Sequence, residues 1–142
     1  MTPTNLDEFT ISTDRDRIDI DVVHGFLKRS YWAAERPIET IRRTIEHSIP
    51  FGVFRGDEMI GFARVVTDYG TIAYVADVFI LEPYRGRGLS KRLMHAMLDH
   101  PELQVMRRWL LATRDAHGLY TQFGFTDLLN PTRWLERRDP TH

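Results

Sequence analysis

Apolar and polar positions divide the N-terminal third of the chain into one strand and two helices. Residues 9–13 alternate apolar and polar side chains, which is typical of a short strand. The apolar positions between Ile18 and Tyr31 recur at intervals of three and four, which predicts a helix. Pro37 suits a first helical turn, and Pro50 is expected to end this second helix. Its apolar stripe consists of Ile38, Ile41, Ile45 and Ile49.

Three strands joined by tight turns are predicted for the middle of the chain. They cover residues 51–55, 58–67 and 71–81, with turns at Gly56-Asp57 and Asp68-Tyr69-Gly70. Connections this short indicate an antiparallel meander. The third strand is apolar along almost all of its length, so we expect it in the middle of a sheet, covered on both faces.

The C-terminal part is predicted to add two helices and two strands. A helical stripe runs from Leu89 to His100, residues 108–113 are strand-like, and residues 116–123 form a short helix with Asp115 as its cap. Residues 125–129 and 132–135 would form a last strand, interrupted by Pro131. The order β-α-α-β-β-β-α-β-α-β predicts one α/β domain over residues 1–142, with a mixed, mostly antiparallel central sheet and helices on both faces.

Composition removes several classes of function. Charged residues make up 27% of the chain but the net charge is only −1, so we expect no nucleic-acid partner. The absence of cysteine excludes disulfides, cysteine-bound zinc and an acyl-cysteine intermediate, and no metal is expected. No apolar run approaches the roughly 18 residues of a membrane span, and Met1–Glu8 is polar and acidic. We therefore expect a cytoplasmic protein that does not bind membranes.

One segment has the features of a phosphate-binding loop: Arg85-Gly86-Arg87-Gly88-Leu89-Ser90-Lys91. It follows an apolar strand and opens an amphipathic helix. Glycines let the backbone approach a ligand, and the free N–H groups and dipole of a helix start favour a phosphate. Arg85, Arg87 and Lys91 add positive charge. The alternative is an ordinary glycine-rich turn with solvated arginines.

Two better-known nucleotide loops do not match this segment. No Gly-Lys-Ser/Thr follows at the distance that a Walker loop requires. A Rossmann fingerprint has a different glycine pattern, and no crossover to a parallel strand is evident from the sequence.

The loop instead resembles the acetyl-CoA-binding motif R/Q-x-x-G-x-G/A of GNAT N-acetyltransferases. Arg85, Gly88 and Ser90 occupy its three defined positions, with serine in place of the usual Gly or Ala. Downstream, residues 116–125 (AHGLYTQFGF) are similar to the family's A-x-x-L-Y-x-x-x-G-F segment, although Thr113 stands where the family often has Asn. The resemblance covers nearly the whole chain and implies a GNAT-like acyl-CoA N-acyltransferase fold with acetyl-CoA as co-substrate.

The resemblance also implies which residues bind the cofactor. The pantetheine arm would pair with the strand backbone, and the diphosphate would lie on the loop. The set comprises Val78, Phe79, Ile80, Arg85, Gly86, Arg87, Gly88, Leu89, Ser90, Lys91 and Tyr120. In that family the tyrosine lies beside the thioester sulfur, so Tyr120, with an ordinary pKa of about 10, is the candidate proton donor to the leaving thiolate. The alternative for Tyr120 is a core aromatic.

Two further groups of residues are candidates for the acceptor side. Asp77 is the only charge in residues 72–81 and is either a general base, an amine anchor or a structural partner of Arg64 or Arg114. His117 is a second base candidate, or a surface histidine.

Tyr31 and Trp32 lie between the first two helices, where the family has its acceptor cleft. They would bind a cationic amine by cation–π contact, or else pack between helices. Trp109 and Trp134 are expected in the core or in a homodimer contact.

Taken together, these features predict transfer of an acetyl group from acetyl-CoA to a primary amine of a small molecule. Without cysteine, direct transfer in a ternary complex is the expected mechanism. A protein or peptide acceptor is the alternative. A non-catalytic acetyl-CoA sensor is a lower one, because the tyrosine is present.

Overall fold

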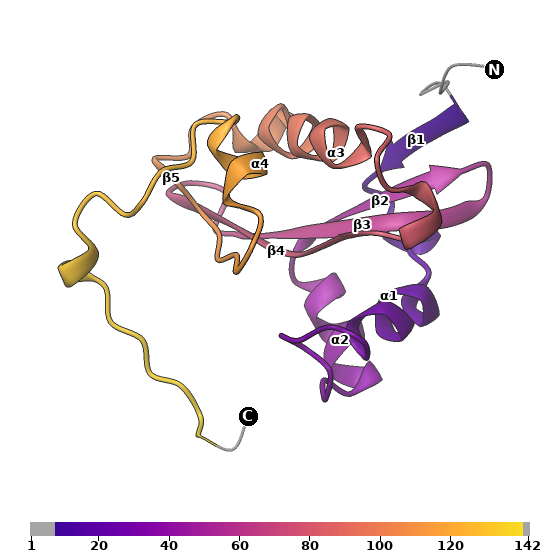
Figure 1. The fold of residues 1–142 in the computed structure, drawn as a ribbon, viewed down its shortest axis with the longest axis horizontal. Coiled ribbons are helices and arrows are strands. Elements are labelled where there is room, and N and C mark those ends of the chain that lie inside the picture. Colours follow the sequence, from indigo (N-terminus) through magenta and orange to yellow (C-terminus); the bar gives the residue numbers. More distant parts are fainter. Residues whose placement is uncertain (1–7, 141–142) are drawn as a thin grey trace. The chain divides into compact units, whose positions relative to one another are not determined.

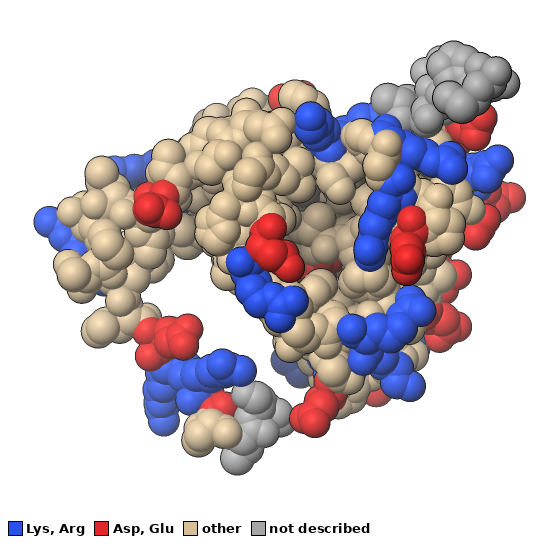
Figure 2. Space-filling model, in the orientation of Figure 1, with Lys and Arg blue, Asp and Glu red and all other residues tan. Residues whose placement is uncertain are grey.

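The computed structural model describes residues 8–140 and divides into two compact units, residues 1–112 and 113–142. The polar N-terminal segment Met1–Glu8 lies, apart from Glu8, outside the described residues. In the part that is described, no helix is long and apolar enough to cross a membrane. Lys and Arg are interspersed with Asp and Glu over the face shown in Figure 2, in keeping with the near-zero net charge.

Residues 8–112 of the first unit form five strands and three α-helices (Figure 1). Short 3-10 turns lie at Arg15–Arg17, Glu82–Tyr84 and Pro101–Leu103. The elements are β1 (Phe9–Ser12), α1 (Ile20–Leu27), α2 (Ile38–Glu46), β2 (Ile49–Arg55), β3 (Glu58–Thr67), β4 (Ile72–Ile80), α3 (Leu89–Leu98) and β5 (Arg108–Leu110).

The strands form one sheet in the order β1-β2-β3-β4-β5. The first four are antiparallel neighbours, and the short turns predicted this for β2, β3 and β4. β5 is parallel to β4, with Ile72 opposite Arg108 and Tyr74 opposite Leu110. The chain from β4 through α3 to β5 is therefore a crossover to a parallel strand, and the expectation that none exists here is wrong. The sequence predicted strand-like residues 108–113 and a mixed sheet, but it did not show which strand β5, of three residues, would pair with.

Helices cover both faces of this mixed, mostly antiparallel sheet, as predicted (Figure 1). α1 and α2 lie on one face and α3 on the other. Asp19 begins α1, since its carboxylate accepts from the backbone N–H of Asp21 and Val22 at 3.1 and 3.2 Å. α2 ends at Glu46, so Pro50 does not end it; this proline lies within β2 instead.

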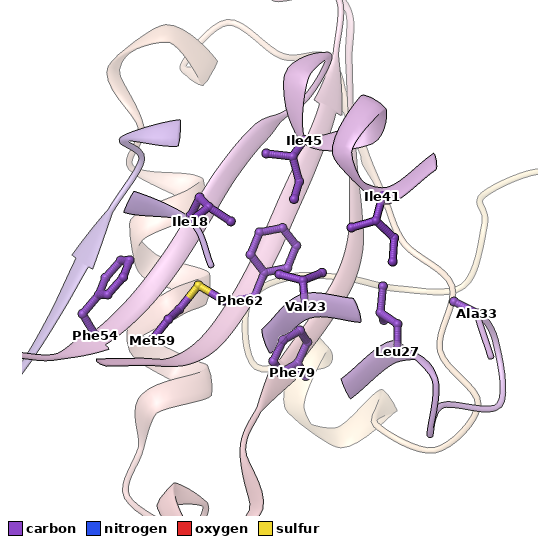
Figure 3. Close-up of a cluster of buried hydrophobic side chains, with 10 residues drawn as sticks. All are labelled: Ile18, Val23, Leu27, Ala33, Ile41, Ile45, Phe54, Met59, Phe62 and Phe79. Carbon is purple, nitrogen blue, oxygen red and sulfur yellow. The ribbon is translucent and has the colours of Figure 1, made fainter. Parts of the chain in front are cut away.

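A cluster of buried apolar side chains fixes α1 and α2 to the sheet (Figure 3). Complete burial of one such side chain stabilises the fold by roughly 1.5–3 kcal/mol. The cluster consists of Ile18, Val23, Leu27, Ala33, Ile41, Ile45, Phe54, Met59, Phe62 and Phe79. Phe79 belongs to β4, so the packing of the two helices also fixes the strand on which the cofactor is expected.

The second unit contains α4 (His117–Thr121), a 3-10 turn at Pro131–Arg133 and irregular chain. The predicted last strand over 125–135 is wrong, because Pro131 begins a turn in which the N–H of Arg133 donates to Asn130 O at 3.0 Å. Asp115 does not cap α4 either. The N–H of Ala116 donates to Thr113 Oγ1 at 3.1 Å.

Neither of the two remaining tryptophans is fully buried. Trp109 in β5 is half-buried, and Trp134 is 38% exposed. Neither side chain therefore has a fully buried core position, and the alternative of a homodimer contact stays a prediction.

Candidate functional site

β4 carries a bulge in the middle of its pairing with β3. Phe62 pairs with Phe79 and Arg64 with Ala76, so two residues of β4, Asp77 and Val78, oppose one residue of β3. Asp77 has a φ of 53°, in the left-handed region that a non-glycine residue seldom adopts. The bulge interrupts the ladder next to the residues expected to bind pantetheine.

The other edge of β4 is open beyond its first residues. β5 pairs with Ile72, Ala73 and Tyr74 only. Among residues 8–140, no strand pairs with this edge of β4 from Val75 to Ile80. Unpaired backbone groups at a sheet edge can pair with an extended ligand. Val78, Phe79 and Ile80 therefore lie where a chain-like molecule could add to the sheet.

The carboxylate of Asp77 is buried and has three donors. Trp32 Nε1 donates to Oδ1 at 2.9 Å, while Arg36 Nη1 and Arg64 Nε donate to Oδ2 at 2.8 and 2.7 Å. The side chain of Asp77 is 3% exposed. The expected pairing with Arg64 is confirmed; Arg114 lies 3.7 Å from Asp115 instead.

These contacts determine the charge state of Asp77. Burial pushes its pKa upward and is the largest single influence. The guanidinium of Arg64, the indole of Trp32 and the guanidinium of Arg36 together outweigh burial and hold the pKa below its ordinary value. A carboxylate that stays ionised and fully hydrogen-bonded is a poor proton acceptor and a strong tether between the loop and the strand.

The structure brings Tyr31 and Trp32 to the same place. Both lie in the loop between α1 and α2, with 56% and 41% of their surface exposed. Their rings meet edge to face at 5.1 Å, and Phe26 lies 6.3 Å from Trp32. Phe26 in turn stacks on Phe79 of β4 at 4.1 Å. An aromatic surface thus extends from the loop to the bulged strand.

The glycine-rich loop follows β4 after one 3-10 turn. Arg85 is fixed to the end of the strand, since its Nε donates to Ile80 O at 2.9 Å. Gly86 and Gly88 both have a φ of 77°, which favours glycine, and Gly88 precedes the first residue of α3. Within the described part of the chain, the backbone amides of residues 86–91 have no hydrogen-bond partner.

Tyr120 lies in the second unit. It is buried, at 8% exposure, and its ring meets that of Phe125 edge to face at 6.1 Å. The N–H groups of Phe123 and Phe125 donate to Tyr120 O at 2.9 and 3.3 Å, and Gly124 has a φ of 89°. The segment that resembles the family motif thus forms a compact turn around the tyrosine. His117 at the start of α4 is exposed, as in its surface interpretation.

Sequence reasoning missed two features of this site. A bulge is a property of the register between two strands and leaves no composition signal. The hydrogen bond from Trp32 to Asp77 joins positions 45 residues apart. The signal that was available is the single charge within an apolar strand, which needs partners wherever it is buried.

Comparison with known proteins agrees with this geometry. The sequence model of the acetyltransferase (GNAT) family matches residues 19–125. The crystal structure of a GNAT-family protein from Xanthomonas campestris pv. campestris superposes with a TM-score of 0.92 at 44% identity, covering 98% of this chain and 96% of that one. This chain belongs to the GNAT family.

Two further relatives extend the comparison. A Gibberella zeae protein named as an acetyltransferase is 27% identical over an alignment of 137 positions, which covers 80% of this chain and 76% of the relative. An acetyltransferase of Clostridium acetobutylicum, crystallised with acetyl-CoA, shares the fold at a TM-score of 0.67 and 14% identity, over 94% and 97% of the two chains. The GNAT acetyltransferase described here thus has the predicted fold and enzyme class.

The residues present fit the family's co-substrate. The open edge of β4 offers backbone groups to an extended arm, and the free amides of residues 86–91 offer donors to phosphate oxygens. Arg87 lies over the ring of Tyr84, 5.7 Å from its centroid, and adds positive charge to the loop.

Proposed function

We propose that this protein transfers an acetyl group from acetyl-CoA to a primary amine of a small molecule, by direct transfer in a ternary complex. The observation that carries the proposal is the row of free amides from residue 86 to residue 91, directly after the open edge of β4. These amides and the start of α3 would hold the diphosphate. Val78, Phe79 and Ile80 would hold the pantetheine arm, and a backbone donor of this strand would polarise the thioester carbonyl.

Both units would contribute to one acetyltransferase domain. The family match runs from residue 19 to residue 125 and so includes the chain on both sides of residue 113. Tyr120 belongs to the second unit. The single domain over residues 1–142 therefore remains part of this proposal, with Tyr120 among its functional residues.

The chemistry needs a proton acceptor for the amine and a proton donor for sulfur. The neutral amine forms a C–N bond to the carbonyl carbon, the C–S bond breaks, and the amine gives up one proton. Tyr120 would donate its phenolic proton to the thiolate. Asp77 already accepts three hydrogen bonds and its pKa is lowered, which supports an anchoring role rather than that of a general base. A chain of water molecules would then accept the amine proton and carry a proton back to the Tyr120 phenolate, which restores the enzyme for the next cycle.

The loop with Tyr31 and Trp32 supports a small acceptor. Trp32 is tethered to Asp77 on the bulge, and Phe26 connects the loop to Phe79. Aromatic rings fixed beside the strand favour a compact site over a long open groove. An amine in a protein or peptide is the alternative acceptor.

A screen of acetyl-CoA-dependent thiol release tests the proposal. Small primary amines, polyamines and peptides with a free N-terminus or lysine would be compared at equal concentration. We expect turnover with members of the small-amine group. Turnover confined to peptides would contradict a small acceptor and favour a protein or peptide amine. Acetyl-CoA binding with no turnover on any amine would contradict the proposed transfer itself.

A further inference from the structure

Two arginines meet on a single carboxylate oxygen at the bulge. Arg36 Nη1 and Arg64 Nε both donate to Asp77 Oδ2, at 2.8 and 2.7 Å. The two guanidinium groups come from different elements, one from the loop before α2 and the other from β3. They are therefore held next to each other by their shared acceptor.

The charge of this group is not balanced. One carboxylate faces two guanidinium ions, which always remain protonated, so the three side chains together have a net charge of +1. Among residues 8–140, neither arginine has a second Asp or Glu within ion-pair distance. A cluster with excess positive charge beside an acceptor site repels a cation and attracts an anion.

The two arginines also retain free donors. A guanidinium has five N–H groups, and Arg36 and Arg64 each use one nitrogen on Asp77. Their side chains are 23% and 12% exposed. In the described part of the chain, every fully buried side-chain nitrogen or oxygen has a partner. The unused nitrogens of these arginines therefore reach solvent, where planar forks of N–H groups suit a carboxylate.

From this arrangement we infer that Arg36 and Arg64 bind a carboxylate group on the acceptor, so that the acceptor is a small amine that also bears a carboxylate. The inference rests on the proposed function, because it takes the aromatic loop beside the bulge as the acceptor site. It names a substrate class that differs from polyamines and lysine-rich peptides. The diphosphate loop at residues 86–91 lies beyond the end of β4 and has its own donors.

Matched pairs of amines test the inference on the unaltered full-length protein. Each pair has the same carbon chain and differs only at the far end: glycine and glycinamide, β-alanine and β-alaninamide, γ-aminobutyrate and γ-aminobutyramide. We expect the carboxylate member of the best pair to have a kcat/KM about tenfold or more above its amide, mainly through KM. Equal rates, or a preference for the amides in every pair, would overturn the inference while leaving the proposed acetyl transfer intact.

Arg36→Gln removes one fork and should reduce this preference to about one, with acetyl-CoA affinity unchanged. Arg36→Lys keeps the charge without the planar fork and should retain part of the preference. Arg42→Gln on α2 is the matched control. Arg42 is exposed and lies 3.7 Å from Glu39, so this variant should leave the preference as it is. A preference that survives unchanged in Arg36→Gln would contradict the assignment.

A binding readout separates this inference from the proposed function. The chain has three tryptophans, so a ¹H–¹⁵N spectrum contains three indole signals, and Trp32→Phe identifies the one bonded to Asp77. We expect this signal to shift on titration with the carboxylate member of a pair, less with its amide, and not in Arg36→Gln. If no amine is turned over but this pattern appears, the arginine site stands and the proposed transfer fails. Equal shifts with the carboxylate and the amide of a pair would contradict the assignment of Arg36 and Arg64 as a carboxylate site.

Discussion

Trp32 and Asp77 are joined by a hydrogen bond of 2.9 Å from the indole Nε1 to Oδ1, across 45 positions of the sequence. This bond connects the loop between α1 and α2 to the bulge of β4. Through this bond the buried carboxylate of Asp77 holds Trp32, and with it the loop expected to bind the acceptor, against the strand. Positioning of a loop in this way can determine how well a second substrate is oriented.

Replacing Trp32 with Phe removes this donor but keeps an aromatic ring. We expect the KM for the amine to rise several-fold, while acetyl-CoA affinity stays the same, because the loop is no longer held against the strand. Loss of a hydrogen bond to a charged group should also reduce the free energy of unfolding by roughly 1.5–3 kcal/mol. Steady-state kinetics and urea unfolding measure the two effects. Tyr69→Phe, at an exposed turn, serves as control, and an unaltered KM in Trp32→Phe would contradict the role of the tether.

Asp77→Asn leaves two guanidinium groups without their shared anion. Removal of one partner from a buried ion pair should lower the free energy of unfolding at pH 7 by about 3–5 kcal/mol. Because the pKa of Asp77 is lowered in the folded state, its contribution is present above the unfolded value of about 3.9 and is lost as the pH falls through the folded pKa.

Urea unfolding at a series of pH values measures this effect. The difference in the free energy of unfolding between wild type and Asp77→Asn should therefore become smaller in acid. Asp57→Asn, in an exposed turn, should have the same free energy of unfolding as wild type at each pH. A gap that stays constant down to the lowest pH would argue against a lowered pKa for Asp77.

The conformation of Gly88 gives a prediction about cofactor binding. A Cβ at this position meets no atom within 4 Å, so only the positive φ of 77° disfavours other residues. Gly88→Val should shift the loop out of this conformation and abolish acetyl-CoA binding in calorimetry, since β-branched residues avoid positive φ. Gly25→Ala in α1, also in open space, should bind normally and unfold at a slightly higher temperature. Normal acetyl-CoA affinity in Gly88→Val would rule out this use of the loop.

Tyr120→Phe tests the proton donor. Loss of general acid catalysis should lower kcat by about 10²-fold or more, with the dissociation constant of acetyl-CoA little changed. Phe keeps the ring that meets Phe125 edge to face, so the fold should be retained. Tyr74→Phe on β4, 40% exposed, is a control that should keep its activity. Rates equal to wild type in Tyr120→Phe would remove the tyrosine from the mechanism.

The sequence predicted those elements whose patterns are local. β3 has the predicted bounds Glu58–Thr67, because polar turns enclose an apolar run on both sides. The glycine-rich loop was found because helix starts and glycines leave clear signals. β5 and the bulge at Asp77 depend on which strand lies opposite, so no local pattern showed the parallel pairing or the extra residue. The predicted last strand is wrong because Pro131 has no N–H to donate to a strand ladder and begins a 3-10 turn.

The free amides that follow β4 are the central feature of the proposed diphosphate site, and amide hydrogen exchange measures them directly. Exchange of residues 86–91 would be followed with and without coenzyme A, with Gly70 as an internal reference because its N–H already donates to Asp68 Oδ1 at 2.9 Å. We predict that coenzyme A slows exchange at residues 86–91 strongly and leaves Gly70 unchanged. Coenzyme A that binds without slowing exchange at these residues would contradict the assignment of this loop to the diphosphate.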